Sequence, residues 1–77
     1  MPLQRLALAE RHVLEGATHV AYQRAHVARL SADDVSRAAQ DARDLLRQFE
    51  LLQDRFVADR DRLRDEARQS SSRSATG

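Results

Sequence analysis

The second half of the 77-residue chain carries an uninterrupted heptad pattern of apolar residues. They follow one another at spacings of three and four, and Leu63 falls on the same line one heptad further on. Such spacing places side chains on one face of a long helix, where another helix must cover them. No Gly or Pro occurs between residues 17 and 76, so long helices are permitted. The pattern comprises Val35, Ala38, Ala42, Leu45, Phe49, Leu52 and Phe56.

The first half carries a second apolar line, which predicts a helix over about residues 3–29 that begins near Pro2. Gly16 lies inside this helix, where it costs about 1 kcal/mol relative to Ala. We therefore expect Gly16 to provide clearance for helix packing. The residues that recur every seven positions are Leu6, Val13, Val20 and Val27.

The break between the two lines falls at a helix-start signal. Ser31 followed by Asp34 resembles a capping box, which predicts a second helix over about residues 32–68, and Ser36 is a weaker alternative cap. The first line continued by sevens reaches Asp34 rather than Val35, so the two lines are out of step. This favours a two-helix antiparallel hairpin. The alternative is one long continuous helix in a coiled coil.

Folding the chain around Ser31 places Val13 near Phe49 and Val20 near Ala42, which alternates large and small residues. The hairpin is predicted to span residues 1–68. The remaining segment consists of small polar residues, which predicts a disordered tail over residues 69–77.

A lone two-helix unit of this size buries little apolar surface, and small helical proteins usually compensate by oligomerising. The chain has no cysteine, so no disulfide can stabilise it instead. We expect a homodimer that forms a four-helix bundle, or a higher oligomer, with an unidentified protein helix as a further candidate partner. The residues expected in the core or oligomer interface are Leu6, Val13, Val20, Val27, Val35, Ala38, Ala42, Leu45, Phe49, Leu52 and Phe56.

The formal net charge is +1, and all thirteen basic residues are Arg interleaved with Asp and Glu. This balance argues against electrostatic capture of nucleic acid or of an anionic membrane. No stretch is long and apolar enough for a membrane span, and the N-terminus lacks the apolar core of a signal peptide. We therefore expect a cytoplasmic protein with no membrane partner.

Three histidines, His12, His19 and His26, recur every seven residues, and each precedes a Val. Seven helical residues rise about 10.5 Å, so two of these imidazoles cannot share one metal ion with ligand distances of about 2.0–2.1 Å. We expect no metal and no cofactor, and rings that lie half-buried at the edge of the helix interface. Imidazole titrates near pH 6.5, so the histidines are candidate pH sensors whose protonation would loosen an assembly.

The segment from His12 to Thr18 resembles the phosphorylated helix of histidine-phosphotransfer domains, where Leu and Gly follow the histidine at the positions of Leu14 and Gly16. Glu15 stands where that family has a Lys. The resemblance implies a phosphotransfer-like signalling protein that uses His12. A dimeric helical hairpin is also the architecture of the copy-control protein Rop, which implies a Rop-like nucleic-acid binder as another alternative.

The chain as a whole resembles a group of short uncharacterised bacterial proteins expected to form helical hairpins, a resemblance that implies a two-helix unit and no activity. Nothing in the sequence forms a catalytic pattern, because serines cluster at the turn and tail and no glycine elbow is present. We therefore expect a non-enzymatic, self-associating helical interaction module. The resemblance rests on Ala9–Val13, Glu15-Gly16, Gln23-Arg24, Val27–Leu30, Leu45-Leu46, Phe49-Glu50 and Asp59–Leu63.

Overall fold

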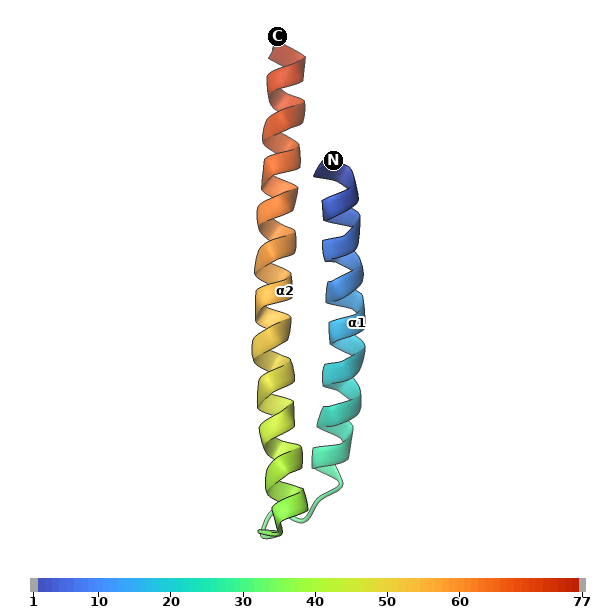
Figure 1. Ribbon diagram of the computed structural model, residues 1–77, viewed down its shortest axis with the longest axis vertical. Helices are drawn as coiled ribbons and strands as arrows, with labels where there is room; N and C mark the ends of the chain where they lie inside the picture. Colours follow the sequence, from blue (N-terminus) through green and yellow to red (C-terminus); the bar gives the residue numbers. More distant parts are fainter. Residues whose placement is uncertain (1, 77) are drawn as a thin grey trace.

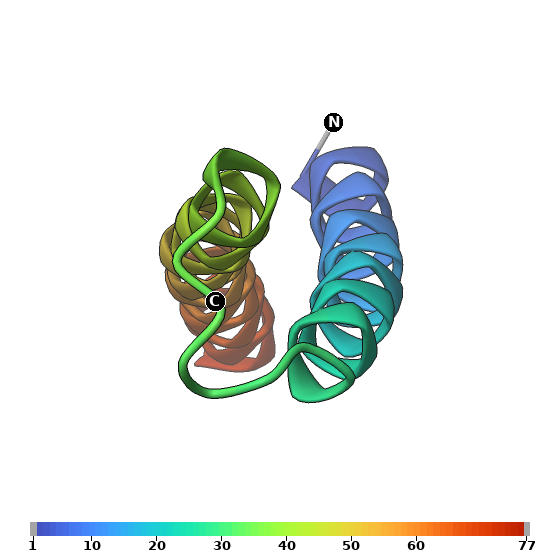
Figure 2. The same cartoon turned by 90° about the horizontal axis from the view of Figure 1, so that it is seen from below.

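The computed structural model describes residues 2–76 in backbone and residues 3–72 with their side chains. Two helices, α1 (Pro2–Ala28) and α2 (Arg37–Thr76), lie side by side and run in opposite directions (Figure 1). The segment 29–36 arcs from one helix to the other (Figure 2). The hairpin measures 62 × 15 × 13 Å. The predicted all-α hairpin is confirmed, and the chain does not form one continuous helix.

The start of α2 differs from the expectation of a helix from residue 32 capped by Ser31. The helix begins at Arg37, and the Ser36 hydroxyl accepts a hydrogen bond from the Ala39 N–H at 3.2 Å. This is N-cap geometry, so the alternative cap is the one the chain uses. The Ser31 hydroxyl instead donates to the Asp33 carboxylate. Two serines with acidic neighbours compete here, and the later one caps the helix.

The connection 29–36 is not helical, and side-chain hydrogen bonds stabilise it. The Arg43 guanidinium donates to the Asp34 carbonyl oxygen at 2.7 Å and to the Ser31 carbonyl oxygen at 3.1 Å. The Ser31 hydroxyl, as a hydrogen-bond donor, lowers the pKa of Asp33. Hydrogen bonds from Ser36, first of all from its backbone N–H at 2.9 Å, lower the pKa of Asp34. The connection therefore carries two carboxylates in their ionised form.

The far end of α2 extends well past the start of α1 (Figure 1). The helix continues to Thr76, whereas a disordered tail was expected from residue 69 onward. The backbone of residues 69–76 is thus helical, and residue 77 lies outside the described residues. Ion pairs between neighbouring turns, such as Arg62–Glu66 at 3.4 Å, line the part of α2 that precedes this projection.

The buried and half-buried positions follow a three-and-four spacing on both helices. Small residues dominate where the helices touch: Ala9 is 3% exposed and Ala39 is 1% exposed. Among the described side chains, no large one is fully buried, so the core of the isolated hairpin is thin. The facing positions are Leu6, Ala9, Val13, Gly16, Val20, Gln23 and Val27 on α1, and Ala39, Ala42, Leu46, Phe49, Gln53, Phe56, Arg60 and Leu63 on α2.

The register differs from the expected one by about one helical turn. The Gln53 amide donates to the carbonyl oxygen of Val13 at 2.9 Å, so Val13 lies opposite Gln53 rather than Phe49. The shift arises because the connection occupies residues 29–36 and not a tight turn at Ser31. A longer connection advances α2 along α1.

In this register, only some of the residues predicted for the apolar face of α2 face α1. Ala42, Phe49 and Phe56 face α1 as expected, whereas Ala38, Leu45 and Leu52 are exposed at the margin of the helix contact. Val35, expected on the helix, lies in the connection and is 78% exposed. Residues one position later, Ala39, Leu46 and Gln53, take the inner positions.

Candidate functional site

The three histidines lie on one flank of the helix contact. The His12 ring centroid lies 5.1 Å from that of Phe56, and the His19 ring centroid lies 5.8 Å from that of Phe49. His12 is half-buried as expected, while His19 and His26 are exposed. Phe56 and Phe49 therefore pack against His12 and His19, and both imidazoles remain accessible at the surface of the hairpin.

Two leucines of α2 share this flank. Leu45 and Leu52 each lie one turn before one of the Phe residues that the histidines contact, and i, i+4 neighbours occupy the same side of a helix. Leu45 is 39% exposed and Leu52 is 43% exposed. We call the surface formed by His12, His19, His26, Leu45 and Leu52 the His–Leu face.

The His–Leu face continues into a shallow groove toward the start of α1. Asp59, one heptad after Leu52, lines this groove together with Arg5, Leu8 and His12. No ion pair crosses from α1 to α2 on this flank among the described side chains. The flank therefore combines apolar side chains, imidazoles and widely spaced charges.

On the opposite flank, two ion pairs join α1 to α2. Arg24 of α1 pairs with Glu50 of α2 at 3.3 Å, and Glu10 of α1 pairs with Arg64 of α2 at 3.6 Å. All four side chains are about half exposed, which keeps the contribution of each pair to stability small. The pairs nevertheless satisfy the charges of both helices within one copy of the chain.

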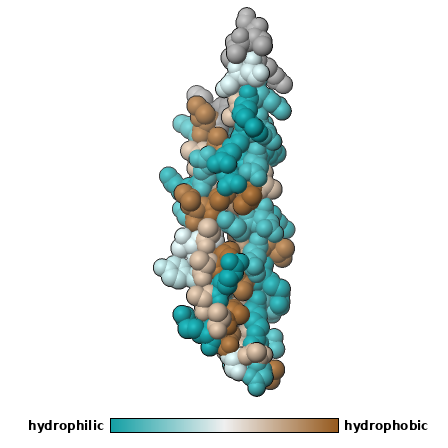
Figure 3. Space-filling model, turned by 180° about the vertical axis from the view of Figure 1, so that it is seen from behind, coloured by the Kyte–Doolittle hydropathy of each residue, from teal (hydrophilic) through white to brown (hydrophobic). Residues whose placement is uncertain are grey.

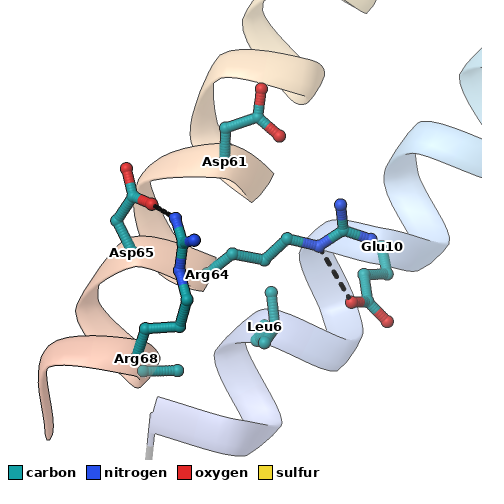
Figure 4. Close-up of a pocket in the computed structure, with 7 residues that line it drawn as sticks. Leu6, Glu10, Asp61, Arg64, Asp65 and Arg68 are labelled. Carbon is teal, nitrogen blue, oxygen red and sulfur yellow. Dashed lines mark hydrogen bonds and ion pairs between the residues drawn. The ribbon is translucent and has the colours of Figure 1, made fainter. Parts of the chain in front are cut away.

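A second groove opens beside the Glu10–Arg64 pair, between the first turns of α1 and the last part of α2 (Figure 4). Arg64 reaches across it toward Glu10, and Arg68 pairs with Asp65 on α2. Asp61 points away from these pairs and contacts Arg60 at 3.0 Å. The charged groups that line this groove are thus occupied with one another.

The outer surfaces of the two helices also differ. Five charged residues occur in α1, whereas seventeen occur in α2. Viewed from behind, apolar residues follow α1 while hydrophilic residues cover most of α2 (Figure 3). Leu14 on α1 is 71% exposed and Leu51 on α2 is 64% exposed. These two leucines are exposed without forming part of the His–Leu face. Within residues 2–76, neither helix combines the length and apolar character needed to cross a bilayer.

Two glutamines form polar contacts that sequence reasoning missed. Gln53 donates to the Val13 carbonyl oxygen, and Gln23 donates to the Ala42 carbonyl oxygen, both at 2.9 Å. Each lies at an inner heptad position, which was the available signal. Each glutamine bonds to the backbone of the opposite helix, so together they fix the register of the hairpin.

Gly16 makes the Gln53 contact possible. A Cβ at Gly16 would come within 1.9 Å of the Gln53 Oε1 atom and within 3.2 Å of a Phe56 ring carbon. The expected packing role of Gly16 is confirmed. The space beside Gly16 is filled by the Gln53 side chain, whose Oε1 atom is buried without a hydrogen-bond partner among the described residues.

No group of three or more metal-ligating side chains comes together within the described part of the chain. Comparison with protein-family models, with curated proteins and with solved structures finds no match to this chain. These comparisons lend no support to the phosphotransfer resemblance or to a bacterial origin. The fold and the surface are therefore the grounds on which a function can be argued.

Proposed function

We propose that the protein is a non-enzymatic helical interaction module that associates with a second copy of itself through the His–Leu face. The observation that carries the proposal is the exposure of Leu45 and Leu52 beside His12 and His19, directly over the half-buried Phe49 and Phe56 rings. Helices in four-helix bundles bury a third row of side chains beyond the two inner rows. In α2 this third row is the one that contains Leu45 and Leu52.

The thin core supports the same proposal. Helix packing within one copy rests on small residues such as Ala9, Ala39 and Ala42, and the larger Phe49 and Phe56 remain partly exposed. A second copy over the His–Leu face would remove these rings and both leucines from water. Full burial of an exposed leucine contributes about 1.5–3 kcal/mol. Because Leu45 is 39% and Leu52 is 43% exposed in the single hairpin, covering what remains would contribute about 1 kcal/mol for each.

The proposal is tested by measuring mass in solution with multi-angle light scattering or sedimentation. We expect the wild-type chain to be a dimer and the Leu45→Asp, Leu52→Asp double variant to be a monomer, because two buried carboxylates would face the partner. Leu51→Asp and Leu14→Asp are matched controls at exposed leucines outside the face, and both should remain dimeric.

A variant that loses the dimer could also lose its helices, so a second measurement is needed. The midpoint of thermal unfolding of the wild-type chain, followed by circular dichroism, should rise with protein concentration if folding and association are coupled. A monomeric wild-type chain with a concentration-independent midpoint would overturn the proposal. So would loss of the dimer in Leu14→Asp together with its retention in the Leu45→Asp, Leu52→Asp variant.

A further inference from the structure

We infer that the second copy lies across the His–Leu face with its helices reversed, related to the first by a twofold axis at the level of His19 and Gln48. This inference rests on the self-association proposed above and adds the arrangement of the two copies. In a twofold interface the same surface meets itself, so each stripe of side chains must be complementary to its own reversal. This flank carries two such stripes, one on α1 and one on α2. Each is complementary to its own reversal, and the centres of the two lie at the same level along the hairpin.

The α1 stripe is symmetric about His19. His12 lies seven residues before it and His26 seven residues after it. A reversed copy therefore places His12 opposite the partner's His26, and His19 opposite the partner's His19. Uncharged imidazoles can pair as hydrogen-bond donor and acceptor, so this contact suits the neutral form of the rings.

The α2 stripe is complementary about Gln48. Asp41 lies seven residues before Gln48 and Arg55 lies seven residues after it, and Leu45 and Leu52 fall between them. Reversal places Asp41 opposite the partner's Arg55 and Gln48 opposite the partner's Gln48, and it brings Leu45 within one residue of the level of the partner's Leu52. One axis thus generates two ion pairs and two leucine contacts.

The centres of the two stripes lie at the same level along the hairpin. The His19 ring contacts the Phe49 ring at 5.8 Å, and Gln48 is the neighbour of Phe49 in the chain. A single axis can satisfy both stripes only if their centres coincide in this way. Nothing in the heptad spacing of either helix alone requires that agreement.

The charges of the monomer are available for these contacts. Arg55 makes no ion pair or hydrogen bond among the described residues, and Asp41 has only a long contact of 3.8 Å to the exposed Arg37. Arg5 is likewise without an ion pair in the described part of the chain. Reversal about His19 places Arg5 beyond the end of the partner's α1, at the end of the hairpin that carries the partner's connection 29–36.

A charge exchange at positions 41 and 55 tests the arrangement. In Asp41→Arg alone, two arginine pairs would face each other across the axis, and in Arg55→Asp alone, two carboxylate pairs would do so. We expect either variant to raise the dissociation constant of the homodimer about tenfold. An equimolar mixture should form a heterodimer about as tight as the wild type, because every opposed pair is then of opposite sign.

The same exchange at Arg47 and Asp54 is the matched control. These residues are also seven apart on α2 but outside the stripe of Leu45 and Leu52, so Arg47→Asp, Asp54→Arg and their mixture should all associate like the wild type. Fluorescence anisotropy of one labelled variant titrated with the other measures the heterodimer.

A disulfide gives an independent readout, because the chain has no cysteine of its own. Gln48→Cys lies on the axis, where two facing thiols can bridge, and it should form a covalent dimer under mild oxidation. Arg47→Cys should not. If Leu45→Asp with Leu52→Asp abolishes the dimer but mixing fails to restore affinity and Gln48→Cys does not cross-link, self-association stands and the reversed arrangement is wrong. If the wild type is a monomer, both fail.

Discussion

On one flank of the helix contact, Arg24–Glu50 and Glu10–Arg64 join α1 to α2, whereas on the other flank imidazoles and leucines lie side by side without an ion pair between the described helices. The ion-paired flank satisfies its own charges within one chain. On the His–Leu face, Leu45 and Leu52 are 39% and 43% exposed and the Phe49 and Phe56 rings are partly exposed. The hairpin therefore pairs its charges on one flank and leaves apolar side chains partly exposed on the other.

Under the proposed self-association, this difference would let a short chain specify both a fold and a contact surface. Exposed ion pairs contribute little to stability, but reversing or burying them is costly, so they discourage a partner from docking on that flank. Exposed leucines beside uncharged rings have the opposite effect, because covering them releases water. If the proposed dimer forms, this arrangement would direct association to the His–Leu face.

The largest effect on stability within the hairpin is expected from the contact that separates the two flanks, where Gly16 faces Gln53. Gly16→Ala should not stabilise the wild-type chain, because the new Cβ would displace Gln53 and break its bond to the Val13 carbonyl oxygen. In a Gln53→Ala background the clash with Gln53 is gone and only the Phe56 ring carbon at 3.2 Å must shift slightly, so the same substitution should stabilise the protein by up to about 1 kcal/mol through helix propensity.

Urea unfolding of the four chains of this double-mutant cycle measures the coupling between the two positions. Because association affects the midpoint, all four should be compared at one protein concentration. Equal effects of Gly16→Ala in both backgrounds would show that Gln53 does not depend on the glycine.

The sequence predicted more of the fold than of the surface. Heptad spacing predicted two helices and their antiparallel packing, because covering an apolar face is a requirement that every turn repeats. It did not predict the start of α2, because Ser31 and Ser36 can both cap a helix and only the contacts of Arg43 with the connection distinguish them. That choice shifted the register and moved Leu45 and Leu52 from the core to its margin.

The polar contacts of the core were missed for a related reason. Gln53 and Gln23 occupy inner heptad positions, but a glutamine there is an exception to apolar patterning until the opposite backbone is known. Gly16 was expected to provide clearance, whereas the side chain that uses the clearance depended on the register. The His–Leu face combines residues of both helices, so it too depended on the register.

A smaller effect is expected from the ion-paired flank. Glu50→Gln removes the charge that faces Arg24 while keeping a similar shape, and it should reduce the free energy of unfolding by about 0.2–1 kcal/mol at low ionic strength. The loss should shrink as salt is added, because screening weakens the pair in the wild type as well. Thermal unfolding at low and high salt measures it.

Asp54→Asn is a suitable control for that experiment, since Asp54 has no ion pair among the described residues. A loss of more than 2 kcal/mol in Glu50→Gln would contradict the view that this flank is held by exposed pairs. The dimer should persist in both variants, because neither residue belongs to the His–Leu face.

The smallest effect is expected at the connection, which belongs to neither flank and so provides a reference for both. Asp34 accepts hydrogen bonds from Ser36 in the folded chain, and this lowers its pKa relative to the unfolded chain. A carboxyl with a lowered folded pKa stabilises the fold above its ordinary pKa, and the stabilisation disappears as the pH falls through the lowered value, that is, below about pH 4. Asp34→Asn keeps an acceptor oxygen but cannot ionise. The variant should therefore be slightly less stable than the wild type at pH 6, and the difference should shrink as the pH falls below about 4. A difference that stays constant over this range would mean that Asp34 acts through shape rather than charge.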